Sequence, residues 1–210
     1  MRLAETGIIL ASSSKRRISL LKKAGIRFIV IPHILKKEPS YGREKDGRIS
    51  SFVKKLALVK AKSLEEKYPD DFIIGSDTLI YFQKNVYGKP SNFEEAFQMI
   101  KNLSGKTHRV YTGTSLVNKN GNIYETRHDV STVKIKPLTD LQIKEYIRKH
   151  PPYDKAGGYG IQDKYSIVES YDGSFENVLG LCIQKLVPLL CKYGLFISAS
   201  PDGKRKNERK

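Results

Sequence analysis

Short apolar runs alternate with helix-like segments along the first half of the chain. Each run is bounded by polar or turn-forming residues, which is typical of buried strands. Between the runs, apolar residues recur every three or four positions, which predicts helices with one buried face. The predicted strands are residues 7–11, 26–31 and 72–82, and the predicted helices are residues 15–25, 50–68 and the stretch from Ser91 or Asn92 to Gly105.

The second half of the chain begins with a different pattern. The runs "HRVYTGTSLV" and "NIYETRHDVSTVKI" predict two long strands, and "NKNG" between them predicts a hairpin turn. A helix follows, because Thr139 and Gln142 have capping-box spacing before a segment that stops at two prolines. A glycine-rich loop over 152–164, a strand over 165–171 and an apolar helix over 178–194 complete the prediction. Together these elements predict an α/β fold with a mixed, twisted central sheet flanked by helices, and a cleft between two lobes.

The composition indicates the size of the core and the compartment. At 210 residues, 39% of them hydrophobic and 29% charged, the chain is long enough to bury a sizeable core. We expect a single domain over residues 1–203 and a disordered basic tail over residues 204–210. No apolar run approaches the ~20 residues that cross a bilayer, and the N-terminus lacks a signal-peptide pattern. With only two cysteines, these features predict a cytoplasmic protein without a membrane partner.

The formal net charge of +16 permits a polyanionic partner. If that partner were nucleic acid, the chain would be a basic binding module. Such a module needs aromatic residues interleaved with cations on one face, whereas the 12 tyrosines mostly fall singly. The charge therefore leaves nucleic acid as the less favoured partner, and a small polyanion as the better candidate.

The stretch "LASSSKRRISLL" holds the clearest candidate site. If residues 7–11 form a strand, Ser12, Arg16 and Arg17 lie at its carboxyl end, where ligands gather in open α/β sheets. Helix N-terminal N–H groups, hydroxyls and guanidinium forks all suit phosphate oxygens. The alternative is a serine N-cap followed by exposed cations, but cations at a helix N-terminus oppose the helix dipole. The stretch therefore favours an anion site.

Asp77 and two lysines are further candidates. Asp77 interrupts an apolar strand, and a buried aspartate needs a partner or a metal. It could hold Mg²⁺ and orient a water molecule, or turn amides at a bulge could satisfy it. Lys60 lies on the apolar face of its helix, where it either extends to water or points into the cleft toward a phosphate. Lys89 follows one β-excursion later and could return to the same cleft.

Several stretches together resemble the Maf family of nucleoside triphosphate pyrophosphatases. They are "LASSSKRRISLLKKAGIRF", "KLALVKAKSL", "IIGSDTLI", "YGKPSNFEEAFQMIKNLSGKTHRVYTG", "DKAGGYGIQ" and "ENVLGL". Their order and spacing over about residues 7–190 carry the resemblance. It implies hydrolysis between the α- and β-phosphates of a nucleoside triphosphate and a fold similar to that of inosine-triphosphate pyrophosphatases. It also implies a divalent metal cation, Mg²⁺ or Mn²⁺, and a homodimer.

The resemblance also implies a role for individual residues. The positions that would bind phosphates are Ser12, Arg16, Arg17, Lys60 and Lys89. Asp77 would be the catalytic residue and a metal ligand. The positions linked to substrate choice, in the branch that takes dTTP and UTP, are Arg16, Thr78 and Gln162.

Gln162 favours that branch on chemical grounds. A side-chain amide can donate to a ring carbonyl of uracil or thymine and accept from the N3–H group, whereas a carboxylate suits the N–H-rich edge of guanine. We therefore predict dTTP or UTP as substrate, and modified pyrimidine nucleotides could be cleared in the same way. The alternative within the family is 7-methylguanosine triphosphate.

One stretch departs from the family pattern. Acidic residues often follow the second strand in this family, but "PHILKKEP" offers Leu35 and Lys36 at that place. The nearest carboxylate is Glu38, and Glu44 comes a little later. Either of them could complete a metal site, or the metal could be held mainly by Asp77 and the phosphates.

Overall fold

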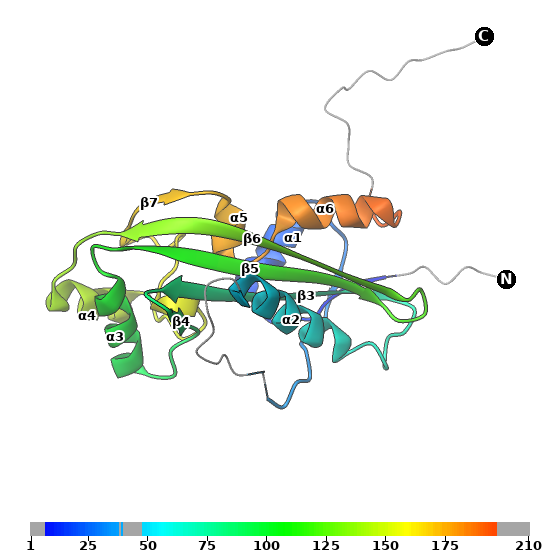
Figure 1. Ribbon diagram of the computed structural model, residues 1–210, viewed down its shortest axis with the longest axis horizontal. Coiled ribbons are helices and arrows are strands. Elements are labelled where there is room, and N and C mark those ends of the chain that lie inside the picture. Colours follow the sequence, from blue (N-terminus) through cyan, green and yellow to red (C-terminus); the bar gives the residue numbers. More distant parts are fainter. Residues whose placement is uncertain (1–6, 38, 40–47, 197–210) are drawn as a thin grey trace, which may run out of the picture.

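A mixed sheet runs through the whole molecule and has helices on both faces (Figure 1). The computed structural model describes residues 7–37, 39 and 48–196. The sheet has seven strands in the order β2-β1-β3-β5-β6-β7, and β4 pairs with β3. The architecture confirms the predicted α/β fold with a mixed, twisted central sheet.

The strands are β1 (Ile8–Leu10), β2 (Ile29–Val30), β3 (Phe72–Phe82), β4 (Asn85–Tyr87), β5 (Thr107–Asn118), β6 (Ile123–Ile135) and β7 (Val168–Asp172). The helices are α1 (Lys15–Lys23), α2 (Ile49–Lys62), α3 (Phe93–Leu103), α4 (Asp140–Lys149), α5 (Phe175–Leu179) and α6 (Ile183–Lys192), with a short 3₁₀ turn at Ala156–Gly158. Strand β1 is parallel to β2 and β3, whereas all other pairings are antiparallel.

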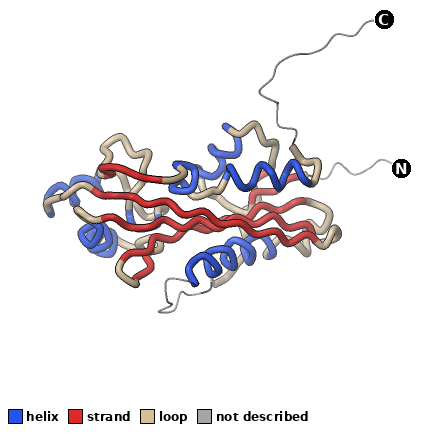
Figure 2. Tube along the Cα trace, turned by 45° about the horizontal axis from the view of Figure 1, so that its top comes forward, coloured by secondary structure: helices blue, strands red, loops and turns tan. Residues whose placement is uncertain are grey.

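Helix α2 covers one face of the sheet, and α1, α5 and α6 cover the other (Figure 2). Two glycines of the sheet let α2 approach closely. A Cβ at Gly75 would lie 2.1 Å from the Ala57 carbonyl oxygen, and one at Gly113 would lie 2.3 Å from that of Val53. Both positions therefore require glycine, and the close approach fixes where the next turn of α2, which carries Lys60, meets β3.

Two of the hydrophobic clusters lie at opposite ends of the sheet. One joins β1, α1 and α6, and the other joins the ends of β5 and β6 to α3 and α4. These clusters correspond to the two expected lobes, although the long strands β3, β5 and β6 continue through both.

One edge of β3 has a gap in its pairing. Strand β1 pairs with Phe72–Ile74, and β4 pairs with Ile80–Phe82 on the same side. Among the described residues, no strand pairs with residues 75–79 along that edge. The Ile74 carbonyl accepts from Ala11 at 2.8 Å across this edge, and alternate residues of a strand direct their main-chain groups to the same side. Ser76 and Thr78 therefore direct their N–H and C=O groups into the gap.

The final predicted helix is wrong in one respect. The apolar run over 178–194 is interrupted at Gly180, which has a φ of 110° and separates α5 from α6. Its carbonyl accepts hydrogen bonds from Arg17 Nε at 2.8 Å and from Ser76 Oγ at 2.9 Å. The break is therefore stabilised by contacts to α1 and β3 that lie far away in sequence.

Three smaller differences concern element boundaries. Helix α2 ends at Lys62, so it is shorter than predicted, and β2 keeps only two residues of its predicted strand. Strand β4 was not predicted, because three residues are too few for a periodic pattern.

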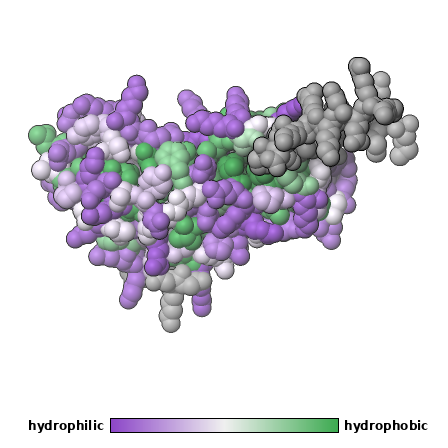
Figure 3. All heavy atoms as spheres, turned by 90° about the horizontal axis from the view of Figure 1, so that it is seen from above, coloured by the Kyte–Doolittle hydropathy of each residue, from purple (hydrophilic) through white to green (hydrophobic). Residues whose placement is uncertain are grey.

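No helix within the described part of the chain is long and apolar enough to cross a membrane. On the face viewed in Figure 3, hydrophilic side chains protrude around the rim and hydrophobic side chains gather along the middle.

Candidate functional site

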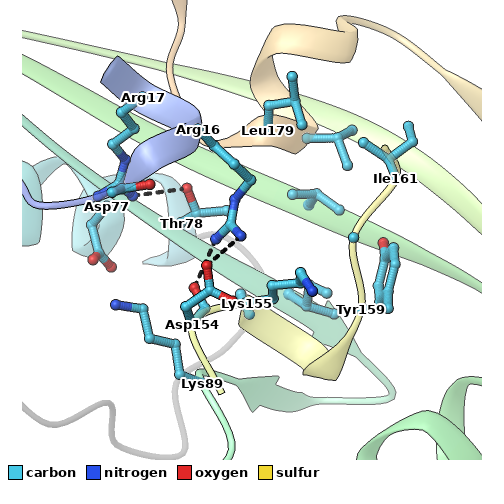
Figure 4. Close-up of a pocket in the computed structure, with 16 residues that line it drawn as sticks. Arg16, Arg17, Asp77, Thr78, Lys89, Asp154, Lys155, Tyr159, Ile161 and Leu179 are labelled. Carbon is cyan, nitrogen blue, oxygen red and sulfur yellow. Dashed lines mark hydrogen bonds and ion pairs between the residues drawn. The ribbon is translucent and has the colours of Figure 1, made fainter. Parts of the chain in front are cut away.

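A pocket lies at the gap in the edge of β3 (Figure 4). Its polar part is lined by Ser14, Arg16, Arg17, Asp77, Thr78, Lys89, Asp154 and Lys155. Its apolar part is lined by Ile80, Val110, Tyr159, Ile161, Val178 and Leu179, with Ala156 and Gly160 between them. The gap explains why consecutive residues of β3 both reach the pocket. Asp77 lies on the α2 face of the sheet and Thr78 on the α5 face, and within the described residues no neighbouring strand separates the two faces there.

Asp77 forms a buried ion pair with Lys60 of α2. The Lys60 ammonium group donates to Oδ1 of Asp77, and the two residues are only 3% and 8% exposed. Lys60 lies outside the pocket wall, whereas Asp77 lines it. The structure therefore places Lys60 behind the carboxylate. Its positive charge offsets the cost of burying Asp77, and Oδ2 is left without a partner among the described residues.

Arg17 connects three elements around the pocket. Its guanidinium group donates to the Gly180 carbonyl oxygen at 2.8 Å, to Ser12 Oγ at 3.3 Å and to Thr78 Oγ1 at 3.3 Å. The side chain is thus fixed between α1, β3 and the start of α6, and it still lines the pocket. The protein has therefore already oriented the guanidinium group that is predicted to bind phosphate.

Arg16 extends across the pocket to the loop that follows α4 (Figure 4). Its guanidinium group donates to the Asp154 carboxylate and to the Asp154 main-chain oxygen, both at 2.7 Å. The Arg16 side chain is 16% exposed and the Asp154 side chain 66%. An ion pair with one partner so exposed to water contributes little to stability, so a phosphate group could exchange with the carboxylate.

The N-terminus of α1 faces the same space. Ser14 is the N-cap residue, but its side chain forms no capping hydrogen bond and lines the pocket. Ser12 is buried and accepts from Ser14 N–H at 3.2 Å and from Arg17, so it orients the turn from behind. Ser14 therefore lines the pocket, whereas the predicted phosphate ligand Ser12 lies behind its wall.

Two lysines complete the cationic part. Lys89, in the loop after β4, is exposed and points its amino group toward the side of the pocket where Asp77 lies. Lys155 is 9% exposed, forms an ion pair with Asp163 at 3.4 Å and donates to the Pro151 carbonyl oxygen at 3.2 Å. Sequence reasoning did not single out Lys155 or Asp154, because only the glycines of their loop were weighed.

Thr78 belongs to a chain of hydrogen bonds that ends in α5. Its hydroxyl oxygen lies 3.0 Å from that of Thr112 on the neighbouring strand, and Thr112 donates to the Asn177 carbonyl oxygen at 2.8 Å. Asn177 is fully buried and donates to the Val110 carbonyl oxygen and to Ser131 Oγ. The motif that contains Asn177, "ENVLGL", is therefore fixed to the middle of β5 and β6.

The apolar part of the pocket is backed by a buried tyrosine and histidine. Tyr159 OH and His108 Nε2 lie 2.7 Å apart, and both residues are almost fully buried. Burial lowers the pKa of His108 to about 4, and it raises the pKa of Tyr159 above its ordinary value. Both groups are therefore neutral at physiological pH, which suits a wall that contacts an uncharged ring.

One predicted site residue lies outside the pocket lining, and two others fall outside the described residues. Gln162 is exposed and follows Ile161, so it lies just beyond the pocket wall. Glu38 and Glu44, the proposed replacements for the family's acidic residues, lie outside the described residues, as does the tail over 204–210.

Comparisons with known proteins identify the family of this chain. The family model described as "Maf-like protein" matches residues 7–193. The chain belongs to the Maf-like family. A protein of Caldicellulosiruptor saccharolyticus, named dTTP/UTP pyrophosphatase, is 40% identical over 190 residues, which cover 89% of this chain and 94% of that protein. A protein of Thermosipho melanesiensis with the same name is 43% identical over 185 residues, which cover 87% and 96% of the two chains.

A Maf-like relative in Bacillus cereus carries the same name and is 39% identical over 193 residues, with coverage of 91% and 92%. Among solved structures, that of the Staphylococcus aureus Ham1 protein matches 62% of this chain and 72% of its own, with 14% identity and a TM-score of 0.42. Family membership therefore rests on the sequence relatives and the family model.

Proposed function

We propose that this Maf-like protein hydrolyses dTTP and UTP to the monophosphate and pyrophosphate, and so removes these or related pyrimidine nucleotides from the nucleotide pool. The observation that carries the proposal is the composition of the pocket. A buried carboxylate, Asp77, lies beside the cations Arg16, Arg17 and Lys89, and an uncharged recess adjoins them. The sequence relatives named dTTP/UTP pyrophosphatase support the choice of substrate.

The polar part of the pocket suits a triphosphate. Phosphoryl transfer needs positioning and neutralisation of charge more than covalent catalysis, and the guanidinium and ammonium groups supply both. Asp77 is held by Lys60 through one oxygen, so its other oxygen can accept a hydrogen bond from the attacking water. Lys60 acts by orienting this carboxylate, which revises its predicted role as a direct phosphate ligand.

A divalent metal fits this site as a partner of the substrate. Mg²⁺ and Mn²⁺ take oxygen ligands, and Mg²⁺ is commonly held by one or two carboxylates together with substrate phosphates. Asp77 is the carboxylate available for this role, and Glu38 remains the second candidate. No group of three or more potential ligands occurs among the residues that the structure describes. When bound, the metal would lower the pKa of a coordinated water.

The ion pair between Arg16 and Asp154 would have to open for a phosphate to bind Arg16. The pocket is partly open to solvent and offers about 60 Å³ of space to water-sized molecules. The bond between Arg16 and Asp154 spans this space, and it is the contact most readily exchanged for a phosphate. We expect the phosphates to take the place of the Asp154 carboxylate on Arg16.

The proposal is tested by incubating the protein with UTP, dTTP, CTP and 7-methylguanosine triphosphate, each with Mg²⁺ or Mn²⁺. Pyrophosphate and orthophosphate are assayed separately. We expect pyrophosphate and a monophosphate, with UTP and dTTP the best substrates. Release of orthophosphate and a diphosphate would overturn the reaction class, and preference for 7-methylguanosine triphosphate would overturn the substrate.

Asp77→Asn provides the matched control. Asparagine is nearly isosteric and can still accept from Lys60, so the variant should fold and lose turnover by orders of magnitude.

The proposal also includes a homodimer in the cytoplasm, where free nucleoside triphosphates are available. Light scattering coupled to gel filtration would report the mass of the assembly.

A further inference from the structure

The hydroxyl group of Thr112 lies within hydrogen-bond distance of two oxygens. Thr112 is fully buried, and its Oγ1 lies 2.8 Å from the Asn177 carbonyl oxygen and 3.0 Å from Thr78 Oγ1. A carbonyl oxygen can only accept, so the shorter of the two contacts is a hydrogen bond only if Thr112 donates its single proton to Asn177. Thr112 then has no proton for Thr78.

The same reasoning fixes the direction of the next hydrogen bond. Since Thr112 donates to Asn177, its contact with Thr78 is a hydrogen bond only if the Thr78 hydroxyl donates to Thr112. Arg17 Nη2 also donates to Thr78 Oγ1, at 3.3 Å. A threonine hydroxyl has one proton and two lone pairs, so Thr78 retains one lone pair and no proton for the pocket that it lines.

An acceptor-only hydroxyl excludes some ligand groups and favours others. It cannot donate to a phosphate oxygen or to a ring carbonyl. It can accept from a ring N–H, such as the N3–H of uracil or thymine, whereas N3 of cytosine is itself an acceptor. Thr78 lines the same pocket as Leu179 of the apolar part (Figure 4), which suits the edge of a flat ring.

We propose that Thr112 is a specificity-determining positioning residue, which makes Thr78 an acceptor for the N3–H group of a uracil or thymine ring. The proposal rests on the proposed pyrophosphatase function and adds the residue that sets its base preference. Thr112 lies outside the pocket wall and acts only through Thr78. Gln162, at the end of the neighbouring loop, keeps its predicted role of donating to a ring carbonyl, so the two residues would contact different groups of the same edge.

Thr112→Val tests the proposal, and Thr112→Ser is its matched control. Valine has the shape of threonine but cannot accept, so the Thr78 proton becomes free to turn into the pocket. The Asn177 carbonyl oxygen keeps the Gly180 N–H at 3.0 Å, so the substitution does not leave it unpaired. Melting temperatures of both variants confirm that they are folded before kinetics are compared.

The measurement is kcat/KM for UTP, dUTP, CTP and 3-methyluridine triphosphate, whose N3 carries no proton. In the wild type we expect UTP and dUTP to exceed CTP and 3-methyluridine triphosphate by about tenfold or more. Thr112→Val should reduce the ratio of UTP to CTP by about tenfold, and Thr112→Ser should keep it within about threefold of wild type.

Three outcomes would overturn the proposal. An unchanged ratio of UTP to CTP in a folded Thr112→Val protein would show that Thr112 does not set the base preference. An effect seen with UTP and absent with dUTP would assign the donor to the ribose 2′-hydroxyl group. A wild type that does not hydrolyse UTP at all would overturn this proposal and the proposed function together, whereas the first two outcomes leave the function intact.

Discussion

The ion pair between Lys60 and Asp77 should be strongly coupled, and Lys60→Met tests this. Removing one partner of a buried ion pair typically costs ~3–5 kcal/mol, because the other charge stays buried without compensation. Asp77 is 8% exposed and lines a pocket that water can enter, so part of its charge can be hydrated. We therefore expect Lys60→Met to lower the free energy of unfolding by about 2–3 kcal/mol. For a protein of this size that is a fall in Tm of roughly 4–12 °C.

The assay is a double-mutant cycle by chemical denaturation with Lys60→Met, Asp77→Asn and the double variant. The double variant removes both charges, so it should recover at least about 1 kcal/mol of the loss while remaining inactive. Lys62→Met is the matched control on the same helix, because Lys62 is 44% exposed and should change stability by less than about 0.5 kcal/mol. Additivity of the two single substitutions within about 0.5 kcal/mol would refute the ion pair as a source of stability.

Three further predictions concern other parts of the molecule. Folded His108 takes up a proton only near pH 4 and the unfolded chain near pH 6.5, so stability is complete above pH 6.5 and falls as the pH drops toward 4. The loss due to His108 should be about 2 kcal/mol at pH 5, and an equally steep decline in His108→Asn, measured by denaturation, would contradict this assignment. Gln162→Glu should reduce kcat/KM for UTP by roughly tenfold to a hundredfold, and equal rates in a steady-state assay would show that Gln162 does not contact the base. Deleting residues 204–210 should leave turnover of UTP nearly unchanged, and a large loss would show that the tail contributes to the site.

Local signals predicted most of the elements correctly. Asn92 caps α3 by accepting from the Glu95 N–H at 2.8 Å, and Gly105 ends that helix region with a φ of 68°. The capping box of Thr139 and Gln142 is present as predicted. These features depend on residues three or four apart, so the sequence displays them directly.

Sequence patterns could not predict contacts between residues that lie far apart in the chain. Arg16 and Asp154 are 138 positions apart, and Thr112 and Asn177 are 65 apart. Asp154 follows two prolines in a polar loop and looks like an ordinary exposed aspartate, and Thr112 looks like one more threonine of a strand. The pairing of β3 with β5 places Thr112 beside Thr78, and the loop after α4 places Asp154 at the pocket.

The gap in the edge of β3 has an evolutionary consequence. Asp77 and Thr78 are consecutive, yet their side chains are supported from opposite faces of the sheet, one by α2 and the other by β5 and α5. A lineage could therefore replace residues behind Thr78 and acquire a new substrate without disturbing the support of the carboxylate. One set of residues would then change when a lineage accepts a new base, while a separate set continues to support cleavage of the same phosphate bond.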